Sequence, residues 1–201
     1  MKNGFTLIEM VVVLSIFTIM TGVVLANLPQ FRERTALQLV AQKMSVTVRE
    51  AQVYGVGVKS SSDSGVDVFP SHGIYFDPVA SNNKSYVLFA DKLTANDRYD
   101  VGTGSCGSAT TECVTKYDLT GTVEIDTLTL CQSANCSSSI NVTGDGLNIV
   151  FNRPKTEANF TNLSGGSLSA SYARIIIKSS RSGEQRFIDV WNTGQISIKT
   201  P

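Results

Sequence analysis

One unbroken apolar segment near the N-terminus constrains this chain more than any other feature. Between Phe5 and Leu28 the only ionisable side chain is that of Glu9, and the segment ends at Pro29. As a helix it would be about 36 Å long, at ~1.5 Å per residue, enough to cross the hydrocarbon core of a bilayer. A helix that is apolar on every side lies in lipid or among similar helices. We therefore predict a transmembrane or filament-core helix over residues 5–29.

The carboxylate of Glu9 separates this segment from an ordinary export signal. A secretory signal has a basic start, a shorter apolar stretch and then a small-residue cleavage site. This run is long, and no clear site of that kind follows it. A plain signal anchor explains the hydrophobicity but gives no reason for Glu9. Because a charge inside a membrane helix costs at least ~2.5 kcal/mol on insertion scales, its presence indicates a function.

The motif Gly4-Phe5-Thr6-Leu7-Ile8-Glu9 resembles the processing site of type IV prepilins and type II secretion pseudopilins. The resemblance implies that residues 1–4 are a leader peptide, that a prepilin peptidase cuts between Gly4 and Phe5, and that the new Phe5 amine is N-methylated. It also implies that Glu9 meets the N-terminal amine of a neighbouring subunit during assembly. The alternative is that Glu9 serves peptidase recognition or caps the helix, where the dipole favours a carboxylate. Both roles can coexist.

The charges that flank the apolar segment do not fix its orientation. Lys2 precedes the segment, whereas Arg32 and Arg34 follow it, so positive-inside counting does not choose an N-in topology. The resemblance implies N-in, because the peptidase acts on the cytoplasmic side. The expected location is the bacterial inner membrane, single-pass with the C-terminal domain in the periplasm, and then a pseudopilus or pilus. The implied partners are the prepilin peptidase, other pilin or pseudopilin subunits, and the membrane itself.

The segment after Pro29 has the periodicity of an amphipathic helix over residues 30–56. One face is apolar and recurs at steps of three and four, namely Leu37, Val40, Met44, Val48 and Ala51. The opposite, solvent-facing side of the helix is predicted to carry Arg32, Glu33, Lys43, Arg49 and Glu50. Gly55 and Gly57 are predicted to end the helix. Because helical periodicity resumes at once, Pro29 is predicted to kink one long helix rather than break it.

Residues 57–201 alternate like β-structure. Predicted strands cover 74–76, 86–89, 122–130, 147–151, 173–178, 186–191 and 195–199, with turns between them. The predicted class is α+β, with a long N-terminal helix, apolar in its first half, packed on a C-terminal antiparallel β-sheet domain. This order resembles the type IV pilin-like fold. Segments 72–77, 85–91, 174–177, 186–190 and 194–196 are similar to the H-type minor pseudopilin and FimT-type minor pilin group.

Four cysteines lie together among Gly, Ser, Thr and Asn residues. The simplest of three possible connectivities is Cys106–Cys113 and Cys131–Cys136. Such disulfides indicate an oxidising compartment such as the periplasm or the cell exterior. The alternative is a four-thiolate zinc site, which prefers two to four residues between paired cysteines. Here the gaps are six and four residues, beyond and at the upper limit of that range, so the spacing favours disulfides.

No set of residues in the sequence indicates catalysis or a bound cofactor. His72 is the only histidine, and it is predicted to be a solvated loop residue just before a strand. Asp91, Asp97 and Asp100, together with Asn96, supply hard oxygen ligands that suit Ca²⁺, but their spacing matches no EF-hand loop. They remain weak calcium candidates. A signal-anchored exported enzyme is the least favoured function.

The last quarter of the chain is basic, whereas residues 55–145 are acidic. The cations are Arg153, Lys155, Arg174, Lys178, Arg181, Arg186 and Lys199. If several of them converged on one face, they could contact DNA phosphates, as in a pilin used for DNA uptake. A solvated sheet face, or a surface complementary to the acidic part of a neighbour, is favoured because no aromatic interleaving is evident. The leading prediction is a minor pseudopilin of a type II secretion pseudopilus, and the alternative is a minor pilin of a type IV pilus.

Overall fold

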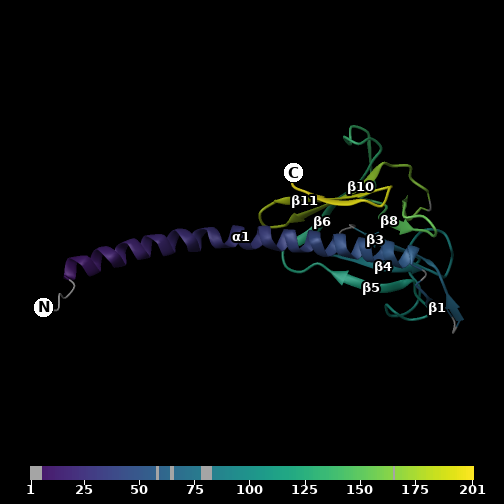
Figure 1. Cartoon of the computed structure of the whole chain (residues 1–201), viewed down its shortest axis with the longest axis horizontal. Coiled ribbons are helices and arrows are strands. Elements are labelled where there is room, and N and C mark those ends of the chain that lie inside the picture. The colour runs from purple at the N-terminus through teal and green to yellow at the C-terminus, as the bar shows by residue number, and fades with distance from the viewer. Residues whose placement is uncertain (1–5, 58, 64–65, 78–82, 165) are drawn as a thin grey trace.

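The computed structural model describes residues 6–57, 59–63, 66–77, 83–164 and 166–201. One long helix, α1 (Leu7–Val56), projects from a β-rich domain, which packs against only the C-terminal half of that helix (Figure 1). The N-terminal half extends away from the domain as a gently curved rod. The predicted α+β class and the predicted long N-terminal helix are thus confirmed.

Helix α1 continues through Pro29 without interruption, as predicted. Leu37, Val40, Met44, Val48 and Ala51 are all buried, so the predicted apolar face is the face that meets the domain. Gly57 caps the C-terminus, and its N–H donates to the carbonyl of Val53.

Gly55 does not end the helix, contrary to the prediction. It lies within the last turn of α1, buried against strand β8. A Cβ atom built on Gly55 would lie 2.4 Å from the carbonyl oxygen of Phe151. The absence of a side chain therefore lets the helix approach the strand backbone closely.

The domain contains twelve strands among the described residues. They are β1 (Ser61–Asp63), β2 (Val66–Val68), β3 (Ser71–Phe76), β4 (Ser85–Asp91), β5 (Cys113–Asp118), β6 (Val123–Cys131), β7 (Ser139–Asn141), β8 (Leu147–Phe151), β9 (Ala158–Thr161), β10 (Tyr172–Ser179), β11 (Gln185–Trp191) and β12 (Ile196–Lys199). Every predicted strand coincides with one of these. The unpredicted strands are β1, β2, β5, β7 and β9, most of which have only three or four residues.

Two five-stranded antiparallel sheets, rather than a single sheet, build the domain. The first has the order β5-β4-β3-β8-β9 and the second the order β12-β11-β10-β6-β7, while β1 and β2 form a separate hairpin. The inner faces of both sheets and the buried face of α1 share one core, which includes Leu37, Met44, Ile74, Ile149 and Ile175. The helix therefore holds the two sheets together along the domain.

Both predicted disulfides are present. Cys106–Cys113 ties the long loop after β4 to the start of β5, and Cys131–Cys136 closes the loop that follows β6. Each bridge fixes a polar surface segment that has little apolar core of its own.

Candidate assembly surface on the N-terminal helix

The first turn of α1 is organised by Thr6 and Glu9. Thr6 is the N-cap, and its hydroxyl oxygen accepts a hydrogen bond from the backbone N–H of Glu9 at 3.4 Å. The carboxylate of Glu9 in turn accepts from the backbone N–H of Thr6 at 3.4 Å and from its hydroxyl at 3.3 Å. This reciprocal capping box satisfies N–H groups that a helix start leaves free. It also places the carboxylate at the positive end of the helix dipole.

The capping role anticipated for Glu9 is therefore present within a single chain. The predicted cleavage and methylation residues, Gly4 and Phe5, lie outside the described residues. The pairing of Glu9 with a second subunit involves another chain. Both remain predictions, and Glu9 is exposed and accessible for such a contact.

Within the described part of the chain, nearly all side chains of the apolar half of α1 are exposed. Side chains such as Leu7, Phe17 and Ile19 are 83%, 68% and 68% exposed. The window apolar enough to span a membrane is the first part of this helix, and none of it is buried. Exposure of so many contiguous apolar side chains marks a surface that is covered by lipid or by protein.

The few polar side chains in the apolar half bond to their own helix. The hydroxyls of Ser15, Thr18 and Thr21 donate to backbone carbonyls three or four residues earlier, each at 2.8 Å. The side-chain amide of Asn27 donates to the carbonyl of Val23 at 3.0 Å. These groups therefore need no water, which suits a helix placed in an apolar environment.

An exposed apolar stripe continues along the half of α1 that carries the domain. Leu39, Val46 and Val53 recur every seven residues and are 60%, 67% and 57% exposed. They lie on the side of the helix away from its buried face. They were not among the predicted contact residues, although a seven-residue apolar spacing is a recognisable sign of a helix contact surface.

The prediction for His72 is wrong. Strand β3 begins at Ser71, so His72 lies within the sheet, opposite Ala90 and Phe151, and is only 1% exposed. Its ring meets Tyr54 edge-on at 5.6 Å, and Nδ1 lies 3.2 Å from the carbonyl oxygen of Pro70. Burial lowers the pKa of His72 to about 4. The turn-like Pro70-Ser71 sequence concealed the fact that the strand starts there.

The acidic loop after β4 uses its carboxylates to hold its own backbone. Asp91 accepts from the N–H groups of Asn96 and Asp97 at 3.3 and 2.9 Å. Asp100 pairs with Arg98 at 3.2 Å. Within the part of the chain that the structure describes, these side chains do not form a metal-binding group of three or more acidic, histidine or cysteine residues. The calcium candidates thus gain no support from the geometry.

Glu112 is a buried carboxylate that the sequence analysis missed. It is 0% exposed, and it accepts from the backbone N–H groups of Leu93 at 3.0 Å and Asp100 at 2.7 Å. Burial raises its pKa to about 7, against the opposing effect of these hydrogen bonds. A single Glu before a short polar strand gives no sequence signal of such burial.

The cations of the last quarter are largely neutralised within the chain. Arg174 and Lys199 both contact Asp189, at 2.7 and 3.0 Å. Lys178 contacts Asp126 at 2.5 Å. Arg181 and Lys155 pair with Glu33 and Glu157. This pairing favours a structural role for these residues over a role in binding phosphates.

The chain therefore combines an exposed apolar helix, a carboxylate in the first turn of that helix and a disulfide-bonded β domain. Residues 1–25 match the family model described as the prokaryotic N-terminal methylation motif. The motif thus lies at the start of the long helix, and the antiparallel sheets follow it in the chain.

The comparisons with whole proteins are distant. No curated protein matches the chain significantly. Among solved structures it is similar to the minor pseudopilin EpsH from the Type 2 Secretion System of Vibrio cholerae, with 12% sequence identity and a TM-score of 0.41. The match covers 82% of this chain and 97% of that chain. A likeness at this level assigns neither a subgroup nor a role.

Proposed function

We propose that this chain is a minor pseudopilin that is cleaved between Gly4 and Phe5, N-methylated on Phe5 and assembled into a type II secretion pseudopilus for protein export. The observation that carries the proposal is the fully exposed apolar half of α1 with Glu9 in its first turn. Before assembly this half spans the inner membrane, with the β domain in the periplasm. Within a filament, neighbouring helices replace the lipid.

Glu9 supplies the specificity of this assembly. Removal of residues 1–4 leaves a positive amine on Phe5, one helical turn from Glu9. In an apolar bundle, a carboxylate and an ammonium from adjacent subunits attract strongly, and each is costly if left alone. A subunit placed out of register would bury both charges unpaired. The pairing therefore selects one axial position, at the expense of the intrachain capping bonds to Thr6.

The test is substitution of Glu9 in the full-length chain in the bacterium that encodes it. Glu9→Ala and Glu9→Gln should leave a folded, membrane-inserted protein whose amount in sheared filaments falls more than about 100-fold, as expected for a buried charge left unpaired. Glu9→Asp retains the charge and should retain partial incorporation. Normal incorporation of the Gln variant would refute the charge-pair mechanism.

Mass spectrometry of the mature N-terminus tests the processing step separately. The proposal requires a chain that begins at Phe5 and carries one methyl group. A retained Met1, or cleavage beyond Ala26, would instead indicate an ordinary anchor or signal. Identification of the co-purifying filament subunits distinguishes a pseudopilus from a type IV pilus, which is the alternative machine.

A further inference from the structure

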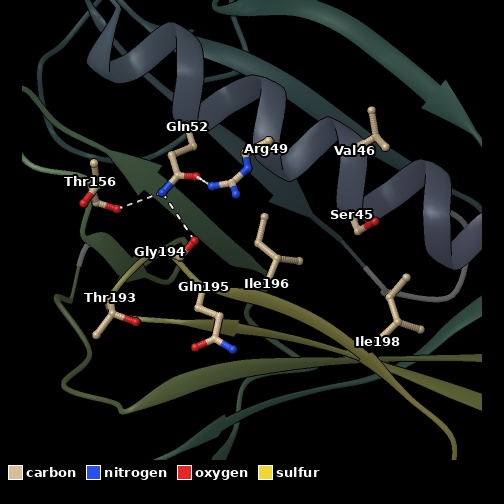
Figure 2. Close-up of a pocket in the computed structure, with 10 residues that line it drawn as sticks. All are labelled: Ser45, Val46, Arg49, Gln52, Thr156, Thr193, Gly194, Gln195, Ile196 and Ile198. Atoms are coloured by element: carbon tan, nitrogen blue, oxygen red, sulfur yellow. Dashed lines mark hydrogen bonds between the residues drawn. The ribbon is translucent and has the colours of Figure 1, made fainter.

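An open groove of about 720 Å³ runs between the second half of α1 and strand β12 (Figure 2). Val46, Arg49 and Gln52 line it from the helix, and Gln195, Ile196 and Ile198 line it from the strand. A smaller hollow that includes Val53 and Val56 shares Arg49 and Gln52 with it and extends it toward the end of the helix. The groove therefore borders the exposed stripe formed by Leu39, Val46 and Val53.

Strand β12 is an edge strand whose free side has unpaired backbone groups. Among the strands of the described residues, it pairs with β11 alone. Because the N–H of Trp191 donates to the carbonyl of Gln195 at 2.8 Å, residues 195, 197 and 199 direct their backbone groups toward β11. Ile196 and Ile198 then direct their N–H and C=O groups away from β11. These groups form a ready template for an added strand.

The other sheet edges are protected in ways that β12 is not. Strand β7 has only three residues, all of them exposed. The edge of β9 is covered by the segment around Ser167, which bridges to Thr161. Strand β5 carries Lys116 and Asp118 and is tied at Cys113 by a disulfide. On β12 the only charge is Lys199 at its end, and this side chain is held by Asp189.

Arg49 gives the groove a positive charge that lacks an acidic partner. Its Nη1 donates to the side-chain oxygen of Gln52 at 2.5 Å. Within the described ranges, no carboxylate forms an ion pair with Arg49, whereas most cations of the last quarter are paired. An occupant that carries a carboxylate opposite Arg49 would complete the groove electrostatically.

We infer that this groove receives an extended segment of an adjoining filament subunit, which adds a strand to the free edge of β12 and places a carboxylate against Arg49. This inference rests on the proposed assembly function, because only an assembled filament places a neighbouring subunit beside the groove and the exposed stripe. The backbone of the added strand forms hydrogen bonds with the outward N–H and C=O groups of Ile196 and Ile198. Its alternate side chains cover Val46 and the apolar faces of the two isoleucines. The second sheet thereby continues from one subunit into the next.

The experiment places a photo-cross-linking amino acid at Gln195 of the full-length chain in its own bacterium, with the exposed Ser137, in the connection between β6 and β7, as the control position. Cross-linked filament subunits are identified by mass spectrometry of the joined peptides. Ile198→Pro removes an outward N–H, whereas Ile198→Ala removes the same side chain and keeps that N–H. Arg49→Glu reverses the charge, and Arg49→Lys preserves it. Circular dichroism tests whether each variant is folded. If Ile198→Pro does not fold, the comparison of Arg49→Glu with Arg49→Lys provides the test.

The inference predicts that Gln195 cross-links to an extended segment of a filament subunit and Ser137 does not. Ile198→Pro and Arg49→Glu should each lower that cross-link about fivefold or more relative to Ile198→Ala and Arg49→Lys. If the chain enters filaments but Gln195 gives no subunit cross-link, or if the paired variants behave alike, the groove inference is wrong and the assembly function stands. If the chain never enters filaments, both are overturned.

Discussion

The side-chain nitrogen of Gln52 lies 3.3 Å from the carbonyl oxygen of Gly194 and donates a hydrogen bond to it across the junction between α1 and the β11–β12 turn. The same nitrogen donates to the carbonyl of Thr156 at 3.1 Å (Figure 2). Gln52 is only 6% exposed, so neither carbonyl is easily satisfied by water instead. One buried amide thus joins the helix to two segments more than a hundred residues away in sequence.

The close approach at Gly194 predicts a large effect of adding one methyl group. Gly194 has φ of +84°, and a Cβ built on it would lie 2.3 Å from both the Gln52 nitrogen and the Thr156 oxygen. Gly194→Ala should therefore destabilise the domain by about 3 kcal/mol, from backbone strain and displacement of Gln52. Urea unfolding of the full chain in detergent, followed by the fluorescence of Trp191, measures this loss.

Gly183 is the matched control for that substitution. It also lies in a turn between strands with positive φ, +71°, but nothing lies within 4 Å of a Cβ built on it. Gly183→Ala should cost only the left-handed strain of about 1 kcal/mol. Equal losses for the two alanine variants would show that the junction with Gln52 does not contribute.

Asp189 is the centre of a second buried network, and we expect its replacement to lower the free energy of unfolding by leaving a cation unpaired. It is 0% exposed, and it bonds to Arg174 at 2.7 and 2.9 Å and to Lys199 at 3.0 Å. Burial alone would raise the pKa of Asp189, but the two cations outweigh it and hold the pKa below its usual value. Asp189→Asn leaves Arg174 without a countercharge on the sheet and should cost about 3–5 kcal/mol.

Lys199→Ala tests whether Arg174 or Lys199 dominates this network. Lys199 is half-exposed, and Asp189 keeps its bidentate partner Arg174 when Lys199 is removed. The expected loss is at most about 1 kcal/mol. Thermal or urea unfolding of the two variants compares them directly. A loss for Lys199→Ala as large as that for Asp189→Asn would contradict the dominance of Arg174.

The parts of the fold that follow from local pattern could be predicted from the sequence. The buried face through Leu37, Met44 and Ala51 follows from helical periodicity, and the long apolar strands follow from alternation. Strand β7 and the β1–β2 hairpin could not be predicted, because a strand of three residues is too short to show a period of its own. They form only because neighbouring strands supply the hydrogen bonds.

The candidate functional residues likewise separate into those that follow from the local sequence and those that depend on tertiary contacts. Glu9 stands out because it is a single charge in an apolar run, and the order of residues around it completes the motif. The burial of His72 and Glu112 depends on contacts with distant residues, such as Tyr54 against His72 and the N–H of Leu93 on Glu112. The groove beside β12 depends on which strand is at the sheet edge, and strand order is set by tertiary pairing.

Because His72 is buried, we expect the domain to lose stability in acid. Burial, aided by the charges of Lys59 and Arg153, lowers the pKa of His72 from 6.5 to about 4, so the folded state resists protonation. Between these values the unfolded chain binds more protons, and the free energy of unfolding falls as pH drops from about 6.5 to 4. The loss is at most about 3 kcal/mol. His72→Phe, which keeps an aromatic ring beside Tyr54, should reduce this slope in urea titrations; an unchanged slope would exclude His72 as its source.

For Glu112 we expect the free energy of unfolding to depend on pH with the opposite sign. Its burial, reinforced by the negative charges of Asp91 and Asp100, raises its pKa from 4.5 to about 7, although the N–H groups of Asp100 and Leu93 favour the carboxylate. The folded state therefore binds the extra proton between these values. The free energy of unfolding should fall as pH rises from about 4.5 to 7, by at most about 3 kcal/mol.

Glu112→Gln removes this titration while preserving the shape of the side chain, and it should flatten the fall in stability toward neutral pH. Because His72 acts in the opposite direction over an overlapping range, the comparison is made in the His72→Phe background. There the Glu112 effect is isolated. Glu157→Gln is the control, since Glu157 is exposed on the surface, where it pairs with the likewise exposed Lys155. If both glutamine variants retain the same pH slope as the His72→Phe protein, the buried carboxylate at the start of β5 does not control the stability of the loop that it holds.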